Sequence, residues 1–172
     1  MSGAQGPRGP VPAELFTAPT PGGIRGLGVG IAVVEAVGIG WAATALRGQP
    51  GLLFATLVPL AVGAIVAVAL VVCRISVTVA EDFAVFAFRP LHRAVVDTAE
   101  IESVELVDRV DPVRLGGVGL RRMPGKVTGL LWGPGPGVEV RTSRGARIVV
   151  AVPAARALHD ALSAARARHA TD

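Results

Sequence analysis

The 172-residue sequence has one cysteine and no tyrosine, and aromatic residues make up only 4% of it. The lone cysteine, Cys73, cannot form an internal disulfide, which excludes the disulfide scaffold of a small secreted protein. Single-stranded nucleic acid binds to aromatic side chains set among basic ones. The most basic stretch of this chain, residues 109–126, contains no aromatic residue. We therefore expect no nucleic-acid partner.

Histidine is also scarce, and the three histidines, His92, His159 and His169, lack the spacing of metal ligands. No serine lies in a histidine-bearing motif. We expect no catalytic residues, no bound metal and no cofactor, and hence no enzyme. Lysine occurs once, at Lys126, beside sixteen arginines in a chain rich in Ala, Gly and Val. This composition is typical of bacteria with GC-rich genomes.

Charged side chains are absent from residues 50–73, PGLLFATLVPLAVGAIVAVALVVC. A helix rises about 1.5 Å per residue, so roughly 20 apolar residues cross the hydrocarbon core of a membrane. Residues 51–73 are therefore predicted to span a membrane. Residues 26–46 form a second apolar stretch, with Trp41 near its far end, where indole rings favour the membrane interface.

Glu35 is the only charged residue of the first span and lies close to its centre. A charge there costs about 2.5–3.5 kcal/mol on insertion scales, so the carboxyl should face protein or be protonated. It either handles protons or cations, contacts a partner helix, or is a neutral acid hydrogen-bonded within a tight helix pair; we favour the last. Small residues four apart (Gly26–Gly30, Ala36–Gly40–Thr44 and Ala55–Pro59–Gly63–Ala67) predict close helix packing.

The link between the spans, residues 47–51, is short enough to force an antiparallel helix hairpin. Arginines near the membrane lie mostly outside this link, which predicts that both termini are cytoplasmic and that the membrane is the cell's inner membrane. The expected organisation is a flexible Pro- and Gly-rich arm over 1–23, the hairpin over 24–73, and a cytoplasmic module over 74–170.

After residue 74 the hydrophobic pattern becomes alternating, which is typical of strands. Seven strands are predicted, at 75–80, 83–88, 93–97, 102–108, 127–132, 138–142 and 147–152. The GPGPG segment between the fifth and sixth predicts a hairpin that joins them. Residues 153–169 read as an amphipathic helix beginning at Pro153. The module is thus expected to be α+β, a bent antiparallel sheet or partly open barrel with a C-terminal helix.

This pattern resembles small bacterial (actinobacterial-type) two-span membrane proteins that carry a PH-like domain. The matching segments are ISVTVAEDFAVFAF, DTAEIESVELVD, RLGGVGLRRMPG and GARIVVAVPAARALHDAL, within residues 27–169. Family members often begin the last helix with acidic residues, whereas this chain has Val152-Pro153-Ala154. The resemblance implies a fold and no defined activity, since such folds bind lipids, peptides and proteins alike.

The Gly- and Arg-rich stretch 109–126 is the candidate anion or lipid contact, because clustered cations attract an anionic leaflet and glycines let a phosphate approach backbone N–H groups. Its candidate residues are Arg114, Gly116, Gly117, Arg121, Arg122 and Lys126. The alternative is a solvated loop, which we favour. The expected function is that of an adaptor or scaffold through protein contacts, with membrane lipids and a membrane-protein partner or second copy as partners. Lipid sensing, or a role as accessory subunit of a transporter or membrane enzyme through Glu35, are the alternatives.

Overall fold

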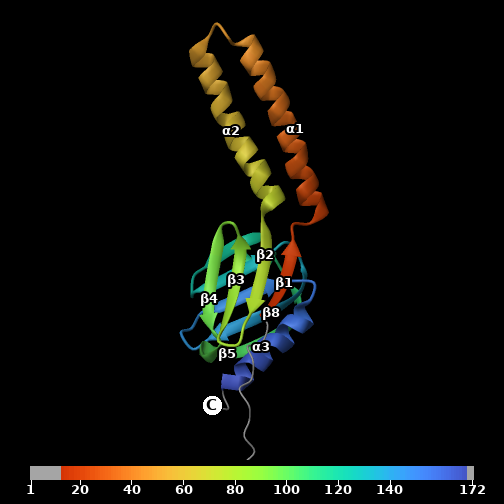
Figure 1. Ribbon diagram of the computed structural model, residues 1–172, viewed down its shortest axis with the longest axis vertical. Helices are drawn as coiled ribbons and strands as arrows, with labels where there is room; N and C mark the ends of the chain where they lie inside the picture. The colour runs from red at the N-terminus through yellow and green to blue at the C-terminus, as the bar shows by residue number, and fades with distance from the viewer. Residues whose placement is uncertain (1–12, 170–172) are drawn as a thin grey trace, which may run out of the picture. The chain divides into compact units, whose positions relative to one another are not determined.

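A computed structural model describes residues 13–169 of the chain (Figure 1). Two compact units are present. One, the helix unit, runs from Pro19 to Cys73. The other, the sheet unit, combines the residues up to Ala18 with those from Arg74 onward.

The helix unit is an antiparallel pair of helices, α1 (Gly22–Ala45) and α2 (Pro50–Val72). Both are long and apolar enough to cross a membrane. The core helix of a soluble protein is mostly buried, whereas large side chains such as Val34, Phe54 and Ile65 are about seven-tenths exposed here. The apolar surface of the pair is thus turned outward, as lipid-facing helices require. Two helices that could span a membrane are therefore present where the sequence predicted spans.

Within the pair, α1 and α2 meet along a different row of small residues from the one predicted for the first span. A Cβ at Gly28 would lie 3.0 Å from the Ala67 carbonyl oxygen, and a Cβ at Gly38 would lie 3.2 Å from Leu60. Gly26, Gly30 and Gly40 have open space around them instead, so the predicted row in the first span is wrong. The contact follows Gly28, Glu35, Gly38 and Ala42, which recur at a spacing of about three to seven residues on one helix face.

The sheet unit begins with sheet A, whose strands lie in the order β1 (Glu14–Pro19), β2 (Arg74–Val79), β3 (Phe83–Arg89) and β4 (His92–Asp97). β1 corrects the prediction of a flexible arm over residues 1–23, of which residues 1–12 lie outside the described part. Residues 14–19 form a strand because the edge of β2 offers them backbone hydrogen bonds. The local sequence alone does not predict this pairing. Ala18 is buried in the result.

Sheet B contains the remaining strands: β5 (Ile101–Val110), β6 (Gly119–Met123), β7 (Val127–Leu131), β8 (Gly135–Thr142) and β9 (Arg147–Ala151). Their order is β5-β8-β9-β7-β6. Short 3₁₀ turns, η1 (Thr98–Glu100) and η2 (Val113–Leu115), precede β5 and β6. Helix α3 (Ala155–His169) ends the described chain and packs against β5, β8 and η1.

The predicted hairpin across GPGPG is wrong. β9 lies between β7 and β8, pairing parallel with β7 and antiparallel with β8. β9 is the more apolar neighbour, with Ile148, Val149 and Val150 all buried, so it takes the centre of the sheet. The hairpin partner of β7 is instead β6, which forms inside the stretch predicted to be a loop.

The main core lies between the two sheets, whose strands run across one another in Figure 1. Ile75, Val77 and Phe86 of sheet A are fully buried, as are Leu130, Val138, Val140 and Val150 of sheet B. At the edge, the Phe88 and Trp132 rings lie 5.0 Å apart. Leu158 and Leu162 of α3 add the last fully buried leucines.

The predicted α+β order of a helix pair, a run of strands and a terminal helix is confirmed. The prediction of a single bent sheet or partly open barrel of about seven strands is not met. Residues 13–169 form nine strands in two open sheets, and neither of these closes into a barrel. The two added strands, β1 and β6, come from stretches rich in Gly, Pro or Arg, where strand propensity is low.

Candidate functional site

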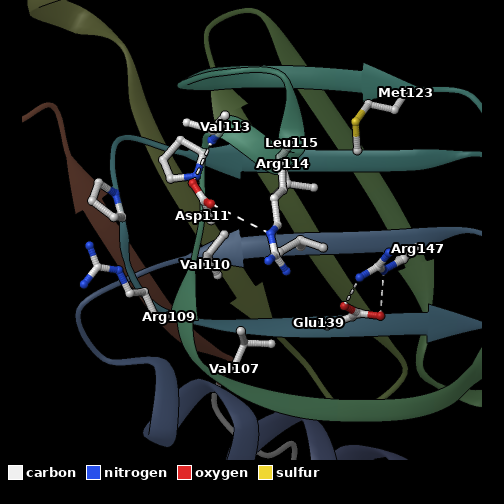
Figure 2. Close-up of a pocket in the computed structure, with 13 residues that line it drawn as sticks. Val107, Arg109, Val110, Asp111, Val113, Arg114, Leu115, Met123, Glu139 and Arg147 are labelled. Carbon is white, nitrogen blue, oxygen red and sulfur yellow. Dashed lines mark hydrogen bonds and ion pairs between the residues drawn. The ribbon is translucent and has the colours of Figure 1, made fainter.

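A pocket of the sheet unit lies on the outer face of sheet B, the face turned away from sheet A (Figure 2). We call it the outer pocket; its volume is about 860 Å³. Register places Glu139 of β8 opposite Val149 of β9 on this face, while their neighbours Val138 and Val150 face the core. The pocket is bounded by the end of β5 and by the segment 109–115, which arches over the sheet.

The floor of the outer pocket is apolar. Val110, Leu115, Leu131, Val149 and Ala151 form a second, smaller hydrophobic cluster on this face. Val107, Met123 and Val127 pack against it and are partly buried. The cluster stabilises the sheet unit from the outside and leaves an apolar surface inside the pocket.

A buried carboxylate forms one wall of the pocket. The Glu139 side chain is only 7% exposed and accepts two hydrogen bonds from Arg147, at 2.6 Å from Nε and 2.5 Å from Nη2. Nε of Arg141 donates a third, at 2.9 Å. Such forked pairing is the strongest arrangement between a guanidinium and a carboxylate. The buried charge is thus fully paired.

Paired in this way, Glu139 stays ionised despite its burial. Desolvation alone would raise the pKa of Glu139, but the hydrogen bonds from Arg147 and Arg141 outweigh it and hold the pKa below its ordinary value. The same pair raises the pKa of Arg147, with a smaller contribution from Glu105 on β5. The wall therefore carries fixed charges near neutral pH.

The opposite side of the pocket is the turn that carries η2. Asp111 Oδ1 accepts a hydrogen bond from the Val113 amide at 2.9 Å, and the Gly117 amide donates to the Pro112 carbonyl at 2.8 Å. Gly116 and Gly117 both have positive φ, at 77° and 112°, which favours glycine. This turn directs Leu115 down into the apolar cluster and leaves Val113 exposed at the rim.

Of the predicted anion-contact residues, Arg114 lines the outer pocket. Figure 2 shows its side chain running from η2 across the pocket toward the Glu139–Arg147 pair. Its only ion pair among residues 13–169 is a loose one, Nε to Asp111 Oδ2 at 3.9 Å, and the side chain is 88% exposed. Arg114 is thus available to a ligand at this site.

The other predicted contacts do not converge with Arg114. The Arg121 guanidinium lies against Gly117, with Nη2 3.0 Å from the place of a Cβ there. The space that a phosphate would need beside this glycine is therefore occupied by the protein's own side chain. Gly116 has open space around its Cα, but no second cation is directed at it by any recorded contact within the described chain.

Arg122 and Lys126 point elsewhere. Arg122 lies on the inner face of β6, where its Nη2 donates a hydrogen bond to His92 Nδ1 of β4 at 3.0 Å. Burial, and then the charge of Arg122, lower the pKa of His92. Lys126 Nζ donates to the Arg144 carbonyl at 3.1 Å, at the far end of β6. The four cations of the predicted cluster are therefore spread over four places.

Glu35, the predicted intramembrane contact, lies inside the helix pair. Its carboxyl fills the notch at Gly63 of α2, where a Cβ would meet Oε1. Oε2 is buried and has no hydrogen-bond partner within residues 13–169. The side chain is thus packed between the two helices as a contact within the pair.

Sequence reasoning missed Glu139, Arg141 and Arg147. The signal was present: alternation in VEVRT places Glu139 and Arg141 on one face of a strand whose other face is Val138 and Val140. Where a covering segment buries such a carboxylate, the carboxylate needs a charged partner. The covering segment, however, is the stretch that the sequence predicts to be a solvated loop.

Within residues 13–169, no group of three or more His, Cys, Asp or Glu side chains is placed to hold a metal ion. Comparisons of the chain with known protein families, with curated proteins and with solved structures found no match.

Proposed function

We propose that this chain is a non-enzymatic integral membrane protein whose sheet unit is an adaptor or scaffold module that binds a segment of a partner protein. The observation that carries the proposal is the outer pocket, with its apolar floor and fixed charges. Pockets of roughly 300–1,000 Å³ that combine an apolar lining with a few placed polar groups are the usual form of a binding site. The volume here, about 860 Å³, lies in that range.

The proposal places the protein in a bacterial inner membrane with both termini in the cytoplasm. It is supported by the two lipid-type helices and by the arginine bias of the flanking segments. Only Cys73 separates the end of α2 from the start of β2, and only Thr20 and Pro21 separate β1 from α1, so the proposed capture of a partner segment is by a unit with short links to both helices.

A PH-like identity for the sheet unit is part of the proposal. Two crossing sheets and a terminal helix packed on β5 and β8 support it. The extra strand β1 and the parallel pairing of β7 with β9 are departures from the antiparallel pattern that the resemblance implies. The binding argument depends on the pocket and does not require this identity.

The anionic-lipid alternative has less support. A headgroup site needs cations that converge, whereas Arg121, Arg122 and Lys126 each lie against a different part of the protein. Arg114 remains available at the pocket and Arg109 at its edge, and each cation near a leaflet contributes only about 1 kcal/mol.

Site-specific photo-crosslinking in native membranes tests the proposal. A benzophenone amino acid is placed at Val113, which is 85% exposed at the pocket rim, and at Val95, which is 59% exposed on β4, as the matched control. We expect one protein, identified by mass spectrometry, to crosslink from Val113 and not from Val95.

The crosslink should also disappear when Val107→Trp fills the pocket, with the fold checked by Trp fluorescence and circular dichroism. Equal capture from both positions, or capture that survives Val107→Trp, would contradict the proposal. A crosslink to lipid alone would favour the lipid sensor instead. A second copy of this chain is an acceptable partner if it meets the same two criteria.

A further inference from the structure

We propose that the outer pocket selects a short apolar peptide segment bearing one carboxylate, with Arg114 as the group that receives the carboxylate. This inference rests on the proposed function and names the chemistry of its ligand. It follows from which charged groups of the pocket are already engaged and which are still available.

Both carboxylates of the pocket are engaged within the protein. Glu139 accepts three hydrogen bonds from Arg147 and Arg141. Asp111 accepts from the Val113 amide and lies beside Arg114. A cationic ligand would therefore have to break an existing pair before it gained one. The pocket disfavours cations for this reason.

The guanidinium groups, in contrast, have donors to spare. Arg114 holds Asp111 only at 3.9 Å, which is an ion pair without a hydrogen bond. The Arg109 side chain has no recorded hydrogen bond or ion pair to any of residues 13–169, and in Figure 2 it extends away from Arg114 at the edge of the pocket. Each guanidinium carries five N–H donors, arranged to match a carboxylate.

The net charge of the pocket is also positive. Three arginines, Arg109, Arg114 and Arg147, line it against two carboxylates, which leaves +1. Arg141 and Glu105 flank the wall and cancel each other. One negative charge on the ligand therefore neutralises the site.

Apolar side chains of the ligand would cover the floor. Val107, Leu115, Met123 and Val149 present it, and burying such surface stabilises a complex by about 25 cal/mol per Å² before ordering costs. Glu139 acts as a positioning residue: it holds Arg147 against the wall, so that this cation does not swing into the pocket. Arg114 is left as the central cation.

The test uses the full chain in nanodiscs of neutral phosphatidylcholine, with empty nanodiscs subtracted. The probes are three pools of end-blocked pentapeptides with Val, Leu, Ile or Phe at the outer positions and Glu, Gln or Lys at the centre. Retained peptides are counted by mass spectrometry. We expect the Glu pool to be enriched about tenfold over the Gln pool and more over the Lys pool, the size of one charge-assisted hydrogen bond.

Arg114→Gln should remove the preference for the Glu pool, while the matched variant Arg156→Gln, on the exposed side of α3, should keep it. Val107→Trp should reduce retention of every pool. Equal retention of the three pools, or a preference that survives Arg114→Gln, would overturn the inference.

A further arm offers dodecanoate. If dodecanoate is retained and no peptide pool is enriched, the ligand of the pocket is a fatty acid. That result would also overturn the inference. The proposed function is tested separately by the crosslink from Val113. If no peptide pool is enriched but Val113 still crosslinks a protein, only the ligand chemistry is refuted. If that crosslink is not found, the adaptor role is refuted.

Discussion

At the scale of single residues, Glu139 is the most constrained charged group of the sheet unit. It is almost wholly buried, yet its two partners, Arg147 and Arg141, remain 44% and 53% exposed. A buried ion pair is a weak source of stability by itself, but removing one partner leaves the other without its contact. Because water can reach the two arginines, removing the Glu139 carboxylate should cost less stability than removing one partner of a fully buried pair.

Glu139→Gln is therefore expected to lower the free energy of unfolding at pH 7 by about 1–2 kcal/mol. The folded pKa of Glu139 lies below its ordinary value of 4.5, so its contribution is complete above about pH 4.5 and is lost as pH falls through the folded pKa. Denaturant unfolding of the full chain, followed by Trp132 in a Trp41→Phe background, measures this difference.

The difference between wild type and Glu139→Gln should shrink as the pH is lowered toward 3. A difference that stays constant between pH 7 and pH 3 would show that the carboxylate form is not what stabilises the fold. Glu102→Gln, on an exposed side chain of β5, is the control that should leave stability within about 0.5 kcal/mol at either pH.

His92 offers a second residue-level prediction. Burial and the Arg122 charge hold its pKa below the ordinary 6.5. Arg122→Gln removes one of these causes, so the pKa of His92 should rise, as measured by an NMR titration of the ring protons. Arg93→Gln, on the exposed face of the same strand, should leave it unchanged; an equal rise in both variants would contradict the pairing.

At the scale of elements, the helices were the most predictable part of the chain. An uncharged run of helix length allows only one low-energy solution in a membrane, and the structure contains both helices. The amphipathic period of residues 153–169 predicted α3 for a related reason. Composition alone could not reveal which face of α1 meets α2, because glycines occur on several faces of that helix.

The strands show where local sequence stops being informative. The seven apolar alternating segments became strands, but β1 and β6 exist because a neighbour supplies their hydrogen bonds. Likewise, turn chemistry at GPGPG predicted that β7 and β8 would pair, and the apolar character of β9 separated them. The candidate site was likewise predictable only in part. The sequence indicated Arg114, whereas Glu139 and Arg147 come together only through that strand order.

Gly28 provides a test of the observed helix contact. Gly28→Ile would push a side chain against the Ala67 backbone, and overpacking of this kind costs about 1–3 kcal/mol. Gly30→Ile faces open space and is the matched control. Spin labels at residues 24 and 70, in a Cys73→Ala background in nanodiscs, should report a longer and broader distance distribution for Gly28→Ile alone. An unchanged distribution would refute this contact.

At the scale of the whole molecule, the sheet unit is built from both sides of the hairpin. β1 precedes α1, and β2 follows α2, yet the two strands are neighbours in sheet A. Thr20, just before α1, donates a hydrogen bond to the carbonyl of Cys73, just after α2. The two ends of the hairpin are therefore joined, and residues 19 and 74 lie on one side of any membrane that the helices cross.

Ala18→Asp tests the importance of β1. Ala18 is 6% exposed, so the new carboxylate would be buried without a partner, and we expect a loss of about 2–3 kcal/mol. Thr17→Asp, on the exposed side of the strand, should cost far less. Urea unfolding followed by Trp132 fluorescence compares them. Equal effects would mean that β1 contributes little to the sheet unit.

The pairing of β1 with β2 also sets an order of events during synthesis. The ribosome releases β1 first, but its neighbour emerges only after both apolar helices have been made. Sheet A therefore cannot be completed before both helices of the hairpin have been synthesised. Until that point β1 lacks its partner strand, so the completion of sheet A depends on the synthesis of the whole hairpin.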